Sequence, residues 1–354
     1  MEKGWDFQYF VLKKKQLQEE LEKTTDLEKK EQIEEDIEIC DNLMLTLLCS
    51  EGETIYSKIT TKSFVEEIYQ QGFSYPIPSA EEKRIEKITL SLAKLPKLKI
   101  EQDNTHITAS DSIELVGDFL KDKFSDKHYQ LFKEVFVDHQ NYVLLDREDE
   151  LSNVTYLDGE IFVRIAESKN MEMLSSIAHE AGHVYRIANS NYKTLIHSYG
   201  EYESFFYEFN LLLWLIENGI YQQEATNQFL RQFDILEKVS YMRYLIQHYQ
   251  LNNIKEPAEF TKTINELHIK KGLHVRKNQD LFNIYSTAMY MDLQTYLNSF
   301  MATLNNINDV SKYEEMVKCI KPGNDDTIKA KVLNKNKGEY DSYLKYRNIL
   351  RNSK

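Results

Sequence analysis

Two short runs of β-branched and aromatic residues interrupt a chain whose other periodic segments are helical. They are residues 153–157 (NVTYL) and 160–165 (EIFVRI), and Asp158–Gly159 separates them. Asp-Gly between two such runs indicates a tight hairpin turn, because both central positions of that turn need positive φ. A third run of this kind lies at 141–146 (NYVLLD). The sequence therefore predicts one small β-sheet within a mainly α protein of the α+β class.

Helical periodicity occupies most of the remaining chain, because apolar residues recur three or four positions apart. Residues 6–49 are expected to form a helical hairpin whose opposite face is rich in Lys and Glu. That face is either solvated or a surface for a protein partner. Gly219, which follows Glu217 and Asn218, is a natural C-cap. Further helices are expected at 111–124, 126–138, 170–189, 200–218, 223–250, 258–271 and 279–306.

The order of these segments predicts three parts. Residues 1–125 are an N-terminal helical region. Residues 126–306 contain the sheet and the candidate functional residues, and residues 307–354 are a helical, polar tail. A chain of 354 residues, of which 42% are hydrophobic, is long enough to bury a sizeable core in such a domain.

The charge of the chain excludes one class of partner. Lys and Arg number 44 and Asp and Glu number 57, so the net charge is 44 − 57 = −13, whereas binding to nucleic acid phosphates requires a basic face. The three cysteines form no CxxC pair, which favours a reducing compartment. The apolar stretch 209–216 is interrupted by Asn210 and is too short to span a bilayer. We therefore expect a cytoplasmic protein with neither nucleic acid nor membrane as a partner.

The segment 175–187 (SSIAHEAGHVYRI) carries the clearest chemistry. His179 and His183 are four residues apart, so on a helix both imidazoles project from one side and can bind a single metal ion. Glu180 is one step round from His179, which suits a general base beside the metal rather than a ligand. Gly182 costs about 1 kcal/mol in a helix interior relative to Ala. Close approach of a second helix would explain the glycine.

A catalytic zinc ion needs a third protein ligand and an open fourth position. On the helix expected at 200–218, Glu201 and Glu208 share one face of a largely apolar run, where an unpaired carboxylate is costly. Glu203 lies off that face and is expected to be exposed to solvent or to lie at the rim of the site. His197 lies in the loop expected before the helix. Glu201 is the favoured ligand, with the other three as alternatives.

These residues resemble a known family. HEAGH, followed by a helix that carries E-x-x-S-x-x-x-E, resembles the thimet oligopeptidase and oligoendopeptidase F family of zinc metallopeptidases, over roughly residues 130–300. The resemblance implies that 126–306 is a zincin-like catalytic domain in which His179, His183 and Glu201 hold one Zn²⁺ ion. It also implies that Glu180 is the general base and that Glu208 orients a ligating histidine.

The resemblance also implies how substrate is bound. A peptide would add as a strand along 160–165, and the residues expected to line it are Glu160, Ile161, Phe162 and Val163. Tyr285 matches the tyrosine that stabilises the oxyanion in the family, with Tyr290 and His274 as further candidates. The sequence departs from the family in three respects. The gap between His183 and Glu201 is shorter, the whole chain is about half the usual length, and no His lies immediately before Tyr285.

Taken together, the residues predict a zinc-dependent metallopeptidase that hydrolyses peptides or oligopeptides. One alternative is a processing peptidase dedicated to one partner's leader or signal peptide. Another is a non-catalytic scaffold, derived from a zincin, that binds a partner through the N-terminal hairpin, although such a scaffold could lose Glu180 freely. Manganese or cobalt could replace zinc in a His/His/Glu site.

Overall fold

The computed structural model describes residues 7–50, 103–145, 152–157, 160–189, 200–248, 293–317 and 339–352, with scattered positions within 84–101 and 259–266. The described chain is mostly helical and contains one three-stranded sheet, which lies before the HExxH helix in the sequence. The predicted fold class is therefore confirmed. The division of the chain at residues 125 and 306 stays a prediction.

The N-terminal segment forms the predicted helical hairpin, from α1 (Phe7–Lys23) and α2 (Leu27–Ser50). The side chain of Asp26 accepts a hydrogen bond from the backbone N–H of Lys29 at 3.3 Å, which satisfies one of the free amides at the start of α2. The apolar faces of the two helices meet around four buried residues, Phe10, Leu17, Ile33 and Cys40.

The sheet has the strand order β1-β3-β2. Strand β3 (Glu160–Ala166) pairs in parallel with β1 (Tyr142–Leu145) and antiparallel with β2 (Asn153–Leu157). Leu157 is the partner of Glu160, so β2 and β3 form the predicted hairpin, whose turn residues lie outside the described part of the chain.

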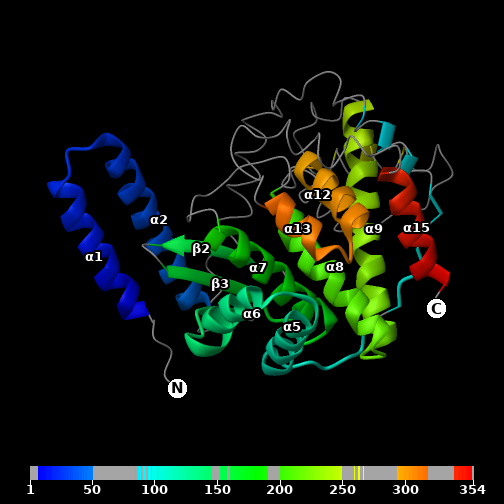
Figure 1. Ribbon diagram of the computed structural model, residues 1–354. Helices are drawn as coiled ribbons and strands as arrows, with labels where there is room; N and C mark the ends of the chain where they lie inside the picture. Colours follow the sequence, from blue (N-terminus) through cyan, green and yellow to red (C-terminus); the bar gives the residue numbers. More distant parts are fainter. Residues whose placement is uncertain are drawn as a thin grey trace.

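The two faces of the sheet are covered by different helices (Figure 1). Side chains alternate along β3. Phe162 packs with the α1–α2 hairpin, whereas Ile161, Val163 and Ile165 belong to the main core, which α7 (Met171–Asn189) shares. The sheet is thus a layer between the hairpin and the helix that carries HExxH.

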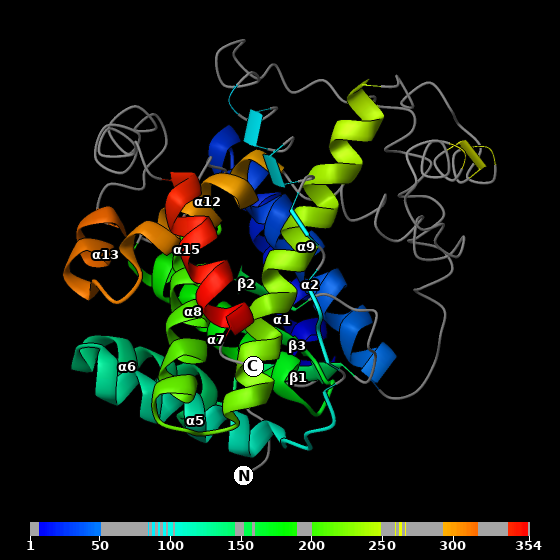
Figure 2. The ribbon, with the colours of Figure 1, turned by 90° about the vertical axis from the view of Figure 1, so that its right-hand side faces the viewer.

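The remaining helices build the main core around α7 and α8 (Tyr202–Glu217), as Figures 1 and 2 show. The helix predicted at 258–271, and residues 279–292 of the helix predicted at 279–306, lie largely outside the described part and stay predictions. The other elements of this core are α5 (Ala109–Lys123), α6 (Asp126–Phe132), the π-helical segment η1 (Lys133–Asp138), α9 (Gln222–His248), α12 (Leu293–Asn306), α13 (Val310–Val317) and α15 (Glu339–Asn352).

Two local features fix the ends of this bundle. Gly219 has φ +68°, and the backbone N–H of Ile220 bonds to the carbonyl of Leu215 at 2.9 Å, which confirms the predicted C-cap of α8. The buried Arg347 pairs with Glu237 at 2.6 Å and ties α15 to α9. Within the part of the chain that the structure describes, no helix is both long enough and apolar enough to cross a bilayer.

Candidate metal centre

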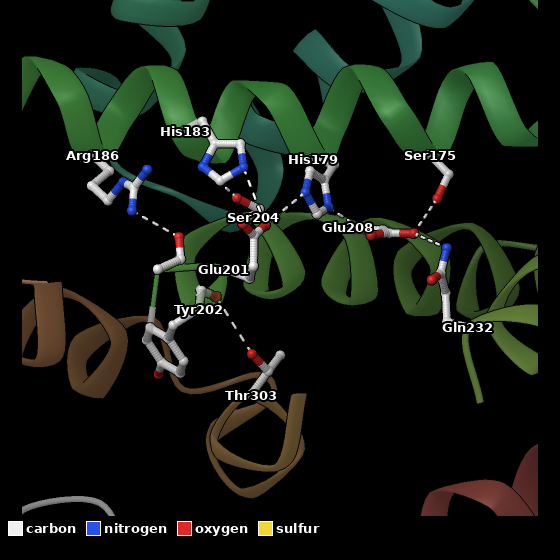
Figure 3. Close-up of polar contacts among 11 residues, drawn as sticks. Ser175, His179, His183, Arg186, Glu201, Tyr202, Ser204, Glu208, Gln232 and Thr303 are labelled. Atoms are coloured by element: carbon white, nitrogen blue, oxygen red, sulfur yellow. Dashed lines mark hydrogen bonds and ion pairs between the residues drawn. The ribbon is translucent and has the colours of Figure 1, made fainter. Parts of the chain in front are cut away.

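Helices α7 and α8 lie unusually close together because α7 has a glycine at the contact. A Cβ built at Gly182 would lie 2.6 Å from the carbonyl oxygen of Glu203 and 2.7 Å from the Cα of Ser204. The close approach that the sequence predicted at this position is thus present. It brings the start of α8 under the two histidines of α7 (Figure 3).

Three side chains converge between the helices. The Nε2 atom of His179 and the Nε2 atom of His183 each lie 3.2 Å from the same oxygen, Oε2 of Glu201. Ligand atoms that are about 2.0–2.1 Å from a tetrahedral zinc ion lie about 3.3 Å from one another. The spacing and the chemistry of the three donors therefore fit a zinc ion.

The other ring nitrogen of each histidine has a partner on α8. Nδ1 of His179 lies 2.9 Å from Oε2 of Glu208, and Nδ1 of His183 lies 2.9 Å from Oγ of Ser204. A carboxylate can only accept, so Nδ1 of His179 donates to it. A proton on Nδ1 leaves Nε2 of His179 available to bind a metal, and the hydroxyl of Ser204, which can accept, allows the same tautomer of His183.

The position of Glu201 is set by the turn that begins α8. Glu201 is the N-cap residue, with φ −102° and ψ 7°, and its carbonyl accepts the hydrogen bond of the Phe205 N–H at 3.0 Å. Arg186 of α7 donates to the carbonyl of the preceding Gly200 at 2.8 Å. Helix α7 therefore anchors Gly200, the residue next to Glu201, whose carboxylate faces the histidines of the same helix.

Glu180 is buried beside this cluster, with 3% of its surface exposed. Its Oε2 atom has no hydrogen-bond partner among the described residues. Burial raises the pKa of Glu180 to about 8, and the carboxylates of Glu201 and Glu208 add to the effect, while His179 opposes it. A buried carboxylate with one free oxygen is suited to accept and hold a proton.

Burial and charge act in opposite directions on the three converging residues. Burial lowers the pKa of His183 to about 4 and outweighs the attraction of Glu201. Burial alone would raise the pKa of Glu201, but the charge and hydrogen bonds of the histidines hold it well below its usual value. Burial alone would lower the pKa of His179, but hydrogen bonds to Glu201 and Glu208 raise it well above its usual value.

The alternatives for the third ligand separate clearly in space. Glu201 faces both histidines, and Glu208 contacts the opposite side of His179. Glu203 was expected to be exposed, and this prediction is wrong: its exposed fraction is 0%. Glu203 lies off the face that carries the ligand, but other parts of the protein cover it, because α8 is buried on nearly all sides. His197 lies outside the described residues.

The candidate oxyanion residues are not placed by the structure. Tyr285, Tyr290 and His274 all lie outside the described part of the chain, and their roles stay predictions.

The structure restricts the predicted substrate strand at one end. Residues Glu160, Ile161, Phe162 and Val163 lie on β3, which pairs with β2 on one side and with β1 on the other. The pairing with β1 begins at Val163, so no peptide strand can add there. Glu160, Ile161 and Phe162 pair only with β2 among the described residues, and their role in binding substrate stays a prediction. The restriction comes from the parallel pairing with β1, a contact between distant segments that hairpin chemistry does not reveal. Within the described sheet, β2 is the edge strand that packs against α7.

Sequence reasoning missed two residues near the cluster. Gln232 of α9 donates to Glu208, and the Tyr296 ring of α12 packs edge-on against Phe205 with 5.6 Å between ring centres. Phe205 in turn packs against His179 at 5.6 Å. Burial, and then the charges of the nearby carboxylates, raise the pKa of Tyr296 above its usual value. In sequence, both residues look like ordinary members of core helices.

Comparisons with known proteins identify the fold. No family model matches the sequence, and no curated protein is similar to it in sequence. Among solved structures, the chain resembles PZ peptidase A with a bound inhibitor, with a TM-score of 0.57, 13% identity, and coverage of 92% of this chain and 68% of that one. It also resembles a Bacillus anthracis str. Ames protein assigned as an oligoendopeptidase F, with a TM-score of 0.52, 13% identity, and coverage of 92% and 65%.

A third structure, assigned as a peptidase from Chlamydophila abortus, matches with a TM-score of 0.47 and 12% identity over 85% of this chain and 55% of that one. The chain thus spans between about half and two thirds of the solved proteins that it matches. The two matches with TM-scores of 0.57 and 0.52 show that the chain shares the mainly helical fold of those peptidases.

Proposed function

We propose that this protein is a zinc-dependent metallopeptidase that hydrolyses peptide bonds in peptides or oligopeptides. The observation that carries the proposal is the convergence of two imidazole nitrogens on one oxygen of Glu201, each at 3.2 Å, beside the buried carboxylate of Glu180. The similarity of the fold to that of solved peptidases supports the proposal. The residues that converge are also of the types that metal-dependent peptide hydrolysis requires.

The proposed ligands are His179, His183 and Glu201. In each histidine Nδ1, the nitrogen that faces away from Glu201, contacts a side chain of α8. A His/His/Glu set suits Zn²⁺ and leaves a position open for substrate. A bound zinc ion would supply Lewis-acid chemistry, making a coordinated water acidic and polarising the carbonyl group of the peptide.

Glu180 is the proposed general base. Its free Oε2 atom takes a proton from the attacking water and transfers it to the departing amine nitrogen, so the carboxylate ends the reaction in its starting state. Burial favours this role, because it holds the carboxylate beside the proposed ligands and away from bulk water.

The substrate is proposed to lie extended along the outer edge of β2, which is antiparallel to β3 and packs against the HExxH helix. An added strand there would gain backbone hydrogen bonds without displacing a neighbour within the described sheet. Tyr285 remains the proposed oxyanion donor, with Tyr290 or His274 as a second donor that assists it.

The test is cleavage of a mixed peptide library, read by mass spectrometry. Five samples are compared: wild type, wild type treated with a chelator, the treated sample reloaded with zinc, Glu180→Gln, and Glu172→Gln. Glu172 is an exposed carboxylate in the first turn of the same helix, so its variant is a matched control. Zinc content is measured for every sample.

The proposal expects cuts that the chelator abolishes, zinc restores, and Glu172→Gln retains. Glu180→Gln should keep its zinc but lose at least about 100-fold in rate. Cleavage by Glu180→Gln at the wild-type rate would overturn the role of Glu180. A folded, zinc-loaded wild type that cuts nothing in the library would overturn the general peptidase activity.

A further inference from the structure

The side chain of Glu208 is held at both of its oxygens. Oε2 lies 2.9 Å from Nδ1 of His179, while Oε1 accepts two hydrogen bonds, one from Oγ of Ser175 at 2.6 Å and one from Nε2 of Gln232 at 2.6 Å. Glu208 is buried, with 3% of its surface exposed. Figure 3 shows Ser175 and Gln232 on either side of the carboxylate, away from His179.

The two donors define which oxygen faces the histidine. The last torsion of a Glu side chain is broad, so a carboxylate without partners rotates freely between similar orientations. Two short hydrogen bonds to Oε1 of Glu208 remove that freedom and leave Oε2 directed at Nδ1 of His179. They also compensate for burying a charged group away from water.

We propose that Gln232 is a positioning residue of the metal centre, which acts through Glu208 to fix the orientation of the His179 imidazole. This makes α9 a third helix of the centre, beyond the two helices that carry HExxH and E-x-x-S-x-x-x-E. The inference rests on the proposed zinc site, but it does not depend on peptide hydrolysis.

The chemistry of an amide suits this position. The NH₂ group of Gln232 donates without carrying charge, so Glu208 keeps its full negative charge for His179. A lysine at position 232 would neutralise that charge, and a glutamate would repel it. The other histidine is held differently: the partner of Nδ1 of His183 is the hydroxyl of Ser204, not a carboxylate that a third helix orients.

The experiment measures zinc affinity of the full-length protein by competition with a chelator, for wild type, Gln232→Met and Gln228→Met. Gln228 is buried one turn earlier on α9, and its Oε1 has no hydrogen-bond partner among the described residues, so it is a matched control. The visible absorption spectrum of each Co²⁺-loaded protein reports the ligand geometry separately. Circular dichroism and the unfolding midpoint of the metal-free proteins check the fold.

Gln232→Met should weaken zinc binding by about 10-fold and shift the cobalt spectrum, in line with the usual effect of removing an outer partner of a ligating histidine. Gln228→Met should change neither. If Gln232→Met folds poorly, Gln232→Glu keeps the shape of the side chain and should weaken zinc binding further, because its carboxylate repels Glu208.

Equal zinc affinity and an unchanged cobalt spectrum in a folded position-232 variant would overturn the proposal, as would an equal loss in Gln228→Met. A wild-type protein that binds no zinc would instead contradict the proposed function. The two failures are therefore distinguishable.

Discussion

Gly182 lies against the backbone of Glu203 at a distance that no other residue type allows: an added Cβ would be 2.6 Å from the Glu203 carbonyl oxygen. Because the obstacle is backbone rather than a flexible side chain, helices α7 and α8 must separate to admit a methyl group. The geometry of the metal centre depends on that separation, since its ligands come from both helices.

Gly182→Ala should therefore lower the free energy of unfolding by about 1–3 kcal/mol, as overpacked sites do, and weaken zinc binding as well. Gly117→Ala on α5 is the control, because a Cβ there meets only ordinary contacts at 3.6 Å. Denaturant unfolding and chelator competition check both variants. Equal behaviour of the two alanine variants would contradict the close-contact argument.

Glu201→Ala should lose zinc binding by more than about 100-fold, a larger effect than removing an outer partner of a ligand. Glu203→Gln is the comparison, because Glu203 is buried two residues away and neither of its carboxylate oxygens has a hydrogen-bond partner among the described residues. It should retain zinc. Metal content after dialysis distinguishes them, and normal zinc in Glu201→Ala would place the third ligand elsewhere.

Tyr285→Phe should lower kcat by about 10²–10³-fold with little change in KM, as expected for a donor that acts only in the transition state. Tyr296→Phe is the comparison and should have a much smaller effect, because the Tyr296 ring packs against Phe205, which itself packs against His179. Steady-state kinetics on a peptide found in the library screen measures both. The reverse order of effects would transfer the role to Tyr296.

His128 predicts a loss of stability in mild acid. It is buried, hydrogen-bonded through Nδ1 to the Tyr207 hydroxyl and stacked on Tyr185, and burial lowers its pKa to about 4, although Glu314 opposes this. In the unfolded chain its pKa is about 6.5. Between these values the unfolded state binds more protons, so the contribution is present above about pH 6.5 and is lost as pH falls toward 4.

The loss should reach at most about 3 kcal/mol. It is measured by urea unfolding of the metal-free protein at neutral and mildly acidic pH, for wild type, His128→Asn and His106→Asn. His106 is exposed on the surface and serves as the control. The stability difference between wild type and His128→Asn should narrow as the pH falls. A constant difference would contradict the prediction.

The parts of the fold that depend on local pattern were predictable. Alternation around Asp158–Gly159 gave the β2–β3 hairpin, and helical spacing placed His179 and His183 on one face. The burial of Glu203 was not predictable from the face of its own helix, because it depends on how many helices surround α8. The contact of Gln232 with Glu208 depends on the docking of α9, and its sequence signal is only one more polar residue in a core helix.

The sheet described above has helices on both of its faces, and this has a consequence for shortened forms of the protein. Phe162, Val143 and Leu157 are covered by Phe10 and its neighbours in the α1–α2 hairpin. A fragment that starts after residue 50 would expose the apolar face formed by these residues, and exposed apolar patches promote self-association. The first fifty residues therefore shield the face of the sheet that is opposite the HExxH helix.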